Sequence, residues 1–314
     1  MKTASELHCG TVAIVGRPNV GKSTLLNQLV GRKVSIATAK PQTTRNRIIG
    51  VTTKPGEHQI IWVDTPGVHR AANLLNKRMV TAALDAADGT DVILFVLEAL
   101  STIREDRPPI WGGDAEVMER VKRAAADRPI VLVLNKIDLL PTKEALLPAL
   151  ARLGESGEFA GIVPIRANRG HNVERIARAV APLLPMGTPV FPDNVVTDRD
   201  EQFMMSELIR EQILLQTHNE VPYGTAVEIE EFADDTDLGR IEISAVIHVE
   251  RDSQKGILIG KGGSRLKEIG IGSRREMQRL FQSRVHLRLM VRVEEDWSGN
   301  DKGLARFGYQ GDEL

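Results

Sequence analysis

One short segment near the amino terminus limits the architectures open to this chain. Residues 16–23 match the pattern G-x-x-x-x-G-K-[ST], which a chain of this composition would contain by chance roughly once in a hundred cases. An apolar, β-branched run at residues 11–15 precedes the segment, and an apolar stretch with helical period follows at residues 22–30. A strand, a glycine-rich turn and a helix in this order predict an α/β domain.

The alternation of short apolar runs and longer helix-period segments continues to residue 184. Apolar runs without polar alternation are typical of parallel strands that helices cover on both faces. The expected strands are residues 11–15, 59–63, 92–97, 130–134 and 161–165, and the expected helices are residues 22–30, 73–87, 114–126, 143–153 and 173–184. We therefore predict a doubly wound α/β domain with a parallel sheet.

Length and composition suggest the number of domains and exclude several classes of protein. With 314 residues, of which 42% are hydrophobic, the chain has room for about two domains. Its 41 Lys and Arg against 42 Asp and Glu leave a net charge of −1, so any basic surface must be local. The single cysteine, Cys9, excludes an internal disulfide framework, and no apolar stretch approaches the ~20 residues that cross a bilayer. We expect a cytoplasmic protein, neither secreted nor membrane-spanning.

A change in composition marks the expected domain boundary. Residues 185–200 carry three prolines among polar residues and show no apolar period, which is typical of a linker. We predict an α/β domain at residues 8–185, a linker at 186–200, a smaller α+β domain at 201–296 and a carboxy-terminal tail at 297–314.

The segment at residues 16–23 has the chemistry of a phosphate-binding loop. It consists of Gly16, Arg17, Pro18, Asn19, Val20, Gly21, Lys22 and Ser23, and Thr24 follows it. Its glycines let backbone N–H groups converge on phosphate oxygens, and the next helix adds partial positive charge at its first turn. We expect Lys22 to neutralise β- and γ-phosphates and the Ser23 hydroxyl to bind Mg²⁺.

Two further motifs follow predicted strands. They are Asp64-Thr65-Pro66-Gly67 and Asn135-Lys136-Ile137-Asp138. In the first motif, Asp64 can hold Mg²⁺ and the Gly67 amide can meet a γ-phosphate. In the second, the Asp138 carboxylate can accept hydrogen bonds from the N1–H and the exocyclic amine of guanine, a pair of donors that adenine lacks.

In this order and context, the three motifs resemble the translation-factor-related class of P-loop GTPases. The resemblance implies GTP and GDP as ligands and Mg²⁺ as cofactor. It implies a catalytic group of Lys22, Thr44, Asp64 and Gly67, metal ligands Ser23, Thr44 and Asp64, and guanine selection by Asn135 and Asp138. Thr44 is assigned by alignment of residues 41–45 (PQTTR) with the mobile switch segment of that class, and Thr43 is the alternative.

The residue after the first motif departs from the simplest catalytic pattern. Val68 stands where Ras-type enzymes carry the glutamine that orients the attacking water. It resembles the subgroup with a hydrophobic residue here, in which an asparagine at the position of Asn19 is associated with a K⁺ ion, so we hypothesise activation by K⁺. A catalytic role for His69 is a less favoured hypothesis, because a lone histidine on a surface loop is usually only solvated.

Two other features differ from the resembled class. Arg166 replaces the usual serine of the guanine loop, whereas Ala167 keeps the backbone amide that is expected to face the guanine oxygen. Residues 98–114 are longer than the corresponding segment and contain two prolines and two glycines, so we predict an exposed loop.

The carboxy-terminal part carries a second glycine motif. Residues 260–263 fit G-x-x-G, a pattern so common that residues 154–157 and 308–311 fit it too. Only the first lies between an apolar run and a helix-period segment, with alternating strands expected before it at 241–249 and after it at 285–293. The predicted order is β-α-GxxG-α-β, as in KH domains, which clamp single-stranded RNA.

Positive charge concentrates around this motif. Residues 255–292 contain ten Lys and Arg against two Asp and Glu, whereas residues 201–314 contain fifteen against twenty-one. A stretch of net charge +8 therefore lies inside a region of net charge −6. The candidate RNA-binding residues are Lys255, Gly260, Lys261, Gly262, Gly263, Arg265, Lys267, Arg274 and Arg275. The alternative is a solvated helix face without a ligand.

GTPase motifs followed by a KH-like unit resemble the Era family, which joins a P-loop GTPase to a type II KH domain. The resemblance implies a slow GTPase that binds the 3′ region of 16S rRNA through its KH domain. It also implies a role in 30S subunit assembly and rRNA processing, and we expect a monomer. Peripheral association with the inner membrane is reported for the family, although no lipidation motif or basic amphipathic helix here requires it.

Two other classes of function remain as alternatives. In the first, a signalling GTPase uses its KH-like domain to contact a protein or membrane surface. In the second, an RNA chaperone carries a vestigial nucleotide site and keeps its RNA binding after Lys22→Ala. RNA affinity separates the first alternative from the favoured function, and GTP hydrolysis separates the second.

Overall fold

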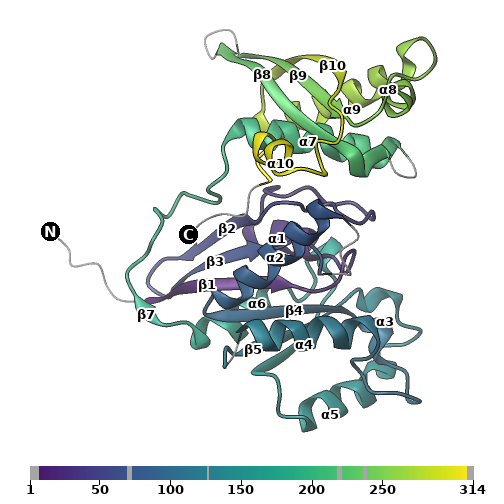
Figure 1. The fold of residues 1–314 in the computed structure, drawn as a ribbon. Coiled ribbons are helices and arrows are strands. Elements are labelled where there is room, and N and C mark those ends of the chain that lie inside the picture. Colours follow the sequence, from purple (N-terminus) through teal and green to yellow (C-terminus); the bar gives the residue numbers. More distant parts are fainter. Residues whose placement is uncertain (1–6, 69–72, 126, 218–220, 236–238, 310–314) are drawn as a thin grey trace, which may run out of the picture. The chain divides into compact units, whose positions relative to one another are not determined.

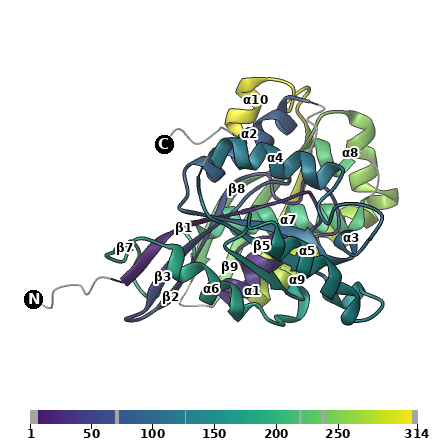
Figure 2. The same ribbon diagram turned by 90° about the horizontal axis from the view of Figure 1, so that it is seen from below.

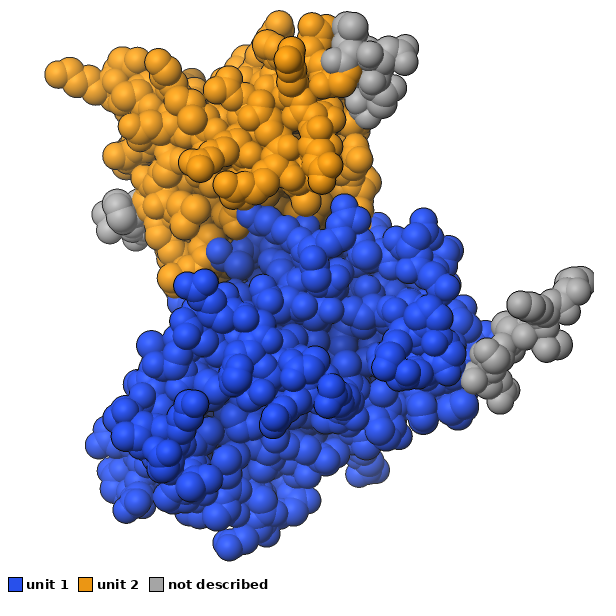
Figure 3. Space-filling model, turned by 180° about the vertical axis from the view of Figure 1, so that it is seen from behind, with its two compact units in different colours: residues 1–37, 44–71, 79–198 blue, residues 38–43, 72–78, 199–314 orange. Residues whose placement is uncertain are grey.

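The chain divides into two compact units (Figure 3). The computed structural model describes residues 7–68, 73–125, 127–217, 221–235 and 239–309. The first unit comprises Met1–Ala37, Thr44–Ala71 and Met79–Asp198, and the second comprises Thr38–Thr43, Ala72–Arg78 and Arg199–Leu314. Two short segments from the amino-terminal half thus belong to the carboxy-terminal unit.

The first unit is built on a seven-stranded sheet. Six strands follow the order β2-β3-β1-β4-β5-β6, and β7 pairs with β1. The strands are β1 (Leu7–Val15), β2 (Ile48–Lys54), β3 (His58–Asp64), β4 (Val92–Glu98), β5 (Ile130–Asn135), β6 (Gly161–Pro164) and β7 (Met186–Gly187). Neighbouring pairs among β1, β3, β4, β5 and β6 are parallel, and these are the five strands that the sequence predicted.

The sheet is mixed, so the prediction of a wholly parallel sheet is wrong. β2 and β7 pair antiparallel with β3 and β1. β2 escaped prediction because it ends in polar residues 52–54 and lacks a continuous apolar run. A tight turn with Gly56 at φ 76° joins β2 to β3. Such a short connection permits only antiparallel pairing, since parallel strands need a long crossover.

Helices cover both faces of this sheet (Figures 1 and 2). They are α1 (Lys22–Val30), α2 (Leu74–Asp88), α3 (Ala99–Thr102), α4 (Gly113–Ala125), α5 (Leu147–Glu155) and α6 (Glu174–Val180). Side chains of α2, α4 and α5 share one core with Phe95 of β4. The neighbours Leu94 and Val96 point to the opposite face and are equally inaccessible to solvent. All five predicted helices are present, within a few residues at each end.

Residues 98–114 are only partly the exposed loop that the sequence predicted. The segment begins with α3, in which Ala99 and Thr102 are fully buried. Farther along, the Arg107 guanidinium lies 3.8 Å from the ring centroid of Trp111, which is 42% exposed. Apolar contact at Ala99 anchors the start of the segment, and its middle remains at the surface.

The second unit contains a three-stranded sheet in the order β10-β9-β8. Its elements are α7 (Glu201–Gln216), β8 (Thr225–Asp235), β9 (Arg240–Val249), α8 (Asp252–Ile259), α9 (Ser264–Phe281), β10 (Arg284–Val293) and α10 (Asp301–Arg306). β9 pairs antiparallel with β8 and parallel with β10. The parallel pair is connected through α8, a turn at Lys261–Gly263 and α9, so the predicted β-α-GxxG-α-β order is confirmed.

The segment predicted as a tail contributes to the core of the second unit. Trp297 is 1% exposed, and its indole N–H donates to the carbonyl oxygen of Gly224 at 3.1 Å. The rings of Phe307 and Tyr309 contact that indole, and Leu304 of α10 is fully buried. In the described part of the chain, every helix is too short or too polar to cross a membrane.

Candidate functional site

The predicted phosphate-binding loop connects β1 to α1. Gly16 has φ 151°, and a Cβ atom there would lie 2.5 Å from the carbonyl oxygen of Val96, so only glycine fits. The Lys22 ammonium folds back over the loop and donates to the carbonyl oxygens of Gly16 at 3.2 Å and Arg17 at 3.1 Å. Burial lowers the pKa of Lys22 to about 8, while the Asp64 carboxylate opposes this shift.

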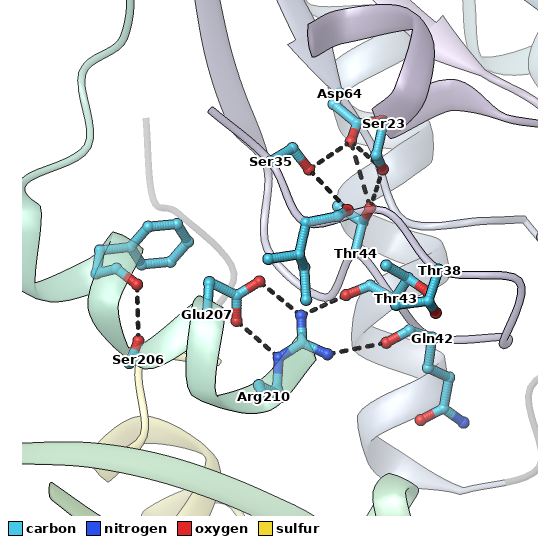
Figure 4. A network of polar contacts seen from close by, with 12 residues as sticks. Ser23, Ser35, Thr38, Gln42, Thr43, Thr44, Asp64, Ser206, Glu207 and Arg210 are labelled. Atoms are coloured by element: carbon cyan, nitrogen blue, oxygen red, sulfur yellow. Dashed lines mark hydrogen bonds and ion pairs between the residues drawn. The ribbon is translucent and has the colours of Figure 1, made fainter. Parts of the chain in front are cut away.

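The three predicted metal ligands meet in one cluster (Figure 4). The Ser23 hydroxyl lies 2.6 Å from that of Thr44 and donates to Oδ2 of Asp64 at 2.7 Å. Thr44 donates to the same oxygen at 3.3 Å, as does Ser35. Burial raises the pKa of Asp64, although Lys22 and the three hydroxyls act in the opposite direction. These oxygens come from α1, the end of β3 and the segment between α1 and β2.

The cluster has the donor set that a hard cation requires. Within the described residues, Oδ1 of Asp64 is buried and has no hydrogen-bond partner. Two hydroxyls and an incompletely satisfied carboxylate therefore converge at one point, which fits the oxygen preference of Mg²⁺. The Thr43 hydroxyl instead contacts Thr38 at 2.6 Å and donates to the Lys40 carbonyl at 2.7 Å. The geometry thus favours Thr44 over Thr43 as the ligand.

Residues 65–68 lie directly against the phosphate-binding loop. A Cβ atom on Gly67 would be 2.7 Å from Pro18, so this approach requires glycine. The backbone N–H of Val68 donates to the carbonyl oxygen of Gly16 at 3.2 Å. The Val68 side chain is fully buried in the core, where it offers no group for orienting a water molecule. His69 lies outside the described residues.

Asn135 braces the loops around the expected base site. It is 3% exposed, and its amide donates to the carbonyl oxygen of Val20 at 2.8 Å. Its own oxygen accepts from the backbone N–H groups of Lys136 at 2.8 Å and Ala167 at 3.0 Å. Asn135 therefore ties the phosphate-binding loop to the guanine loop. The role expected for the Ala167 amide, which is to face a guanine oxygen, stays a prediction.

Lys136 supports the loop from the other side. Its ammonium donates to the carbonyl oxygen of Asn19 at 2.8 Å and pairs with the Glu98 carboxylate. Asn19 has φ 66°, a left-handed conformation that this contact helps to hold. Sequence reasoning missed Glu98, although its place at the end of a buried strand was a usable signal.

Arg166 lies beside the carboxylate that is expected to recognise guanine. Its Nε is 3.4 Å from Oδ2 of Asp138 and donates to Oδ1 of Asn168 at 3.0 Å. The arginine that replaces the usual serine therefore competes for the acceptor that the base would use.

Arg17 brings a further, unpredicted contact to the phosphate-binding loop. Its guanidinium lies 3.7 Å from the Asp114 carboxylate, whose pKa is raised by burial and lowered by Arg17. Asp114 is the last residue of the segment 98–114 and lies in the first turn of α4. This segment was assigned no role from sequence, and the structure connects it to the loop.

The predicted RNA-binding motif forms an open, positively charged turn in the second unit. Gly260, Gly262 and Gly263 have φ values of 71°, 60° and 79°, and the space around a Cβ at Gly262 or Gly263 is free. Six cationic side chains on α8, the turn and α9 are exposed or half-buried: Lys255, Lys261, Arg265, Lys267, Arg274 and Arg275. Among the described residues, none of the six forms an ion pair with a carboxylate, so their charge is available to a polyanion.

Comparisons with known proteins cover both parts of the chain. The family model "50S ribosome-binding GTPase" matches residues 11–136, and the KH domain model matches residues 220–298. The GTPase Era of Geotalea daltonii is 47% identical over 98% of this chain and 100% of its own length. The GTPase Era of Stenotrophomonas maltophilia strain K279a is also 47% identical, over 99% of this chain and 100% of its own.

Two solved structures cover nearly the whole chain. A crystal structure of an Aquifex aeolicus Era variant bound to GDP.AlF4⁻ has TM-score 0.88 and 37% identity, covering 96% of this chain and 99% of that one. A structure of Era in complex with MgGDPNP and nucleotides 1506–1542 of 16S ribosomal RNA has TM-score 0.88 and 38% identity, with the same coverage. This chain therefore belongs to the Era family of GTPases, in which a P-loop GTPase domain precedes a KH domain.

Proposed function

We propose that this GTPase binds the 3′ region of 16S rRNA through its KH domain and acts in assembly of the 30S subunit and rRNA processing. The observation that carries the nucleotide part is the oxygen cluster of Ser23, Thr44 and Asp64 beside the buried ammonium of Lys22. Apolar packing stabilises the fold without this cluster, so the cluster indicates a binding site. It fits the β- and γ-phosphates of a nucleotide with their Mg²⁺.

Each part of the site receives a distinct proposed role. Lys22 neutralises phosphate charge, and Ser23, Thr44 and Asp64 organise Mg²⁺, which supplies positive charge between the phosphates when bound. The Gly67 amide faces the γ-phosphate. Asp138 selects guanine, and Asn135 holds the surrounding loops. Hydrolysis is slow, because Val68 is buried in the core and supplies no polar group to the attacking water.

The charge and shape of the second unit support the RNA-binding part. The glycine turn is open, and the turn with its two flanking helices carries six cations without carboxylate partners among the described residues. A family member that is 38% identical was solved with 16S rRNA nucleotides. We further propose a cytoplasmic monomer. The inner-membrane association of the family stays an expectation from resemblance.

We expect Gly262→Asp to abolish selective binding to an oligonucleotide from the 3′ end of 16S rRNA. The added carboxylate repels phosphates, and its Cβ atom would meet no protein atom within 4 Å, although the φ of 60° strains any side chain there. Gly157→Asp is the matched control. Gly157 has φ 64°, a Cβ atom there would also meet nothing within 4 Å, and the residue belongs to another G-x-x-G sequence. Filter binding measures both variants. If wild type binds scrambled RNA equally well, or if Gly262→Asp has no effect, the proposed ribosomal function is wrong. The result would then favour a signalling GTPase.

We expect Asp64→Asn to remove the Mg²⁺ dependence of nucleotide binding. The amide cannot supply the negative charge that orders the cation, so Mg²⁺ affinity should fall by at least the roughly 10- to 100-fold that loss of an outer-shell partner costs. Titration of fluorescent GDP with Mg²⁺ or with EDTA measures the effect. Ser35→Ala is the control, because it removes a hydrogen bond to the same carboxylate oxygen without changing the charge. An unchanged Mg²⁺ effect in Asp64→Asn would exclude this residue from the metal site.

We expect GTP turnover to be several-fold faster in KCl than in NaCl at equal ionic strength. A K⁺ ion near Asn19 would add positive charge at the transition state, where charge accumulates on the phosphates. Asn19→Ala should reduce turnover in KCl to the NaCl rate. This change spares the Asn19 carbonyl, which accepts from Lys136. Equal wild-type rates in the two salts would refute activation by K⁺.

We expect Arg166→Ser to tighten GDP binding and slow GDP release. The change removes the cation that competes for Asp138, and its effect should not exceed about fivefold, because exposed ion pairs contribute ~0.2–1 kcal/mol. Arg169→Ser, in the same turn, controls for loss of charge. Stopped-flow release of a fluorescent GDP measures both variants. Weaker binding by Arg166→Ser would mean that the arginine supports the bound base.

A further inference from the structure

A buried arginine of the second unit holds the main chain just before Thr44. The Arg210 side chain, in the middle of α7, is 1% exposed. Two of its nitrogens donate to the Glu207 carboxylate, each at 2.6 Å. The guanidinium also donates to the carbonyl oxygens of Gln42 at 3.2 Å and of Thr43 (Figure 4). All of these groups belong to the same compact unit.

The pair of Glu207 and Arg210 is not explained by stability alone. Replacing a buried ion pair with apolar residues of similar volume is often neutral or stabilising, so its presence is weak support for a purely structural role. The planar fork of arginine can hold a carboxylate and still donate to other acceptors. Here the additional acceptors are two consecutive main-chain carbonyls, so Arg210 fixes the path of the backbone at residues 42–43.

Other contacts hold the same segment in the second unit. The Lys40 ammonium donates to the carbonyl oxygen of Thr217, at the end of α7. The Gln42 amide donates to Oδ1 of Asn76 in the first turn of α2 at 2.9 Å. Gln42 has φ 58°, a left-handed conformation that is unfavourable for a residue with a side chain. Surrounding contacts must impose this conformation, and it directs the Gln42 carbonyl to Arg210.

The next residue belongs to the proposed metal site. The boundary between the compact units falls between Thr43 and Thr44. The Thr43 carbonyl belongs to the peptide bond that Thr44 shares, so α7 holds one side of this bond. On the other side, the Thr44 hydroxyl contacts Ser23 and Asp64. A displacement of residues 42–43 must therefore move Thr44.

We propose that Arg210, held by Glu207, is a positioning residue that places Thr44 for Mg²⁺-GTP and transmits the nucleotide state to α7 of the KH domain. The inference rests on the proposed role of Thr44 as a metal ligand. GTP with Mg²⁺ favours the conformation in which Thr44 reaches the cluster, and Arg210 favours the same conformation. Two interactions that favour the same conformation reinforce each other. The contacts of Arg210 therefore raise the affinity of the protein for GTP relative to GDP.

Arg210→Lys tests the positioning role. Lysine keeps the positive charge beside Glu207, but its single ammonium cannot also hold both carbonyls of residues 42–43. We expect the preference for a non-hydrolysable GTP analogue over GDP to fall about fivefold or more, the usual lower limit of such coupling. GDP affinity should stay close to that of wild type. Fluorescent nucleotide titrations in Mg²⁺ measure both affinities.

Arg279→Lys is the matched control. Arg279 also pairs with a glutamate three residues earlier in a helix of the second unit, with Arg279 Nη1 3.0 Å from Glu276, but its side chain is 66% exposed. This variant should keep the wild-type preference. If Arg210 had only a structural role, Arg210→Lys would weaken the binding of both nucleotides equally, or lower the melting temperature without changing the ratio of the two affinities.

Hydrogen exchange of the wild-type full-length chain gives a test that does not depend on the variant folding. We expect amides of residues 201–217 to exchange more slowly with the GTP analogue than with GDP. An unchanged preference in a folded Arg210→Lys protein, or equal exchange of α7 in both nucleotide states, overturns the inference. Failure of wild type to bind guanine nucleotides would instead overturn the proposed function, so the two failures are distinguishable.

Discussion

The shared carboxylate oxygen of Asp64 is the contact on which the nucleotide site depends. Hydroxyls of Ser23, Ser35 and Thr44 all donate to this one atom, and they come from a helix and a loop that the fold brings to the end of β3. Burying a carboxylate is costly unless hydrogen bonds and opposite charge compensate it. Here three hydroxyls donate to one oxygen and the charge of Lys22 stabilises the carboxylate, while the other oxygen has no hydrogen-bond partner among the described residues. The protein alone therefore leaves the carboxylate incompletely satisfied, which favours binding of a cation.

Rigid bracing complements this incomplete cluster. Asn135 links the phosphate-binding loop to the guanine loop, and Lys136 holds the Asn19 carbonyl while pairing with Glu98. Three of these contacts use backbone groups as partners, so they fix the path of the loops. The loops around the expected base site are thus held in place by the protein itself. At the metal site, by contrast, one buried carboxylate oxygen of Asp64 has no hydrogen-bond partner among the described residues. Such a division is suited to a protein in which the γ-phosphate, and not the base, distinguishes two states.

Features that depend on local sequence were predictable, and features that depend on long-range packing were not. The glycine loop and the five parallel strands follow from residue type and periodicity. β2 was missed because its stability comes from pairing with β3 and from apolar cover on one face, and neither leaves a continuous apolar run. Asp114 and Arg210 were missed because a single charged residue carries no pattern, and Glu98 was missed although it ends a buried strand. Glu98 pairs with Lys136, 38 positions away, and Asp114 with Arg17, 97 positions away, while Arg210 reaches the Thr43 carbonyl 167 positions away, so only folding reveals these contacts.

Lys22 and Arg210 bind the main chain in similar ways, and the similarity bears on how the site changes state. Each is a buried cation that donates to two consecutive carbonyls, at residues 16–17 and 42–43. Phosphate oxygens are stronger acceptors for an ammonium than neutral carbonyls, because charged partners strengthen a hydrogen bond. Lys22 can therefore exchange its carbonyls for a nucleotide, but Arg210 cannot, since its charge is already matched by Glu207. One cation is thus available to the ligand and the other stays with the backbone, and Thr44 lies on the chain between them.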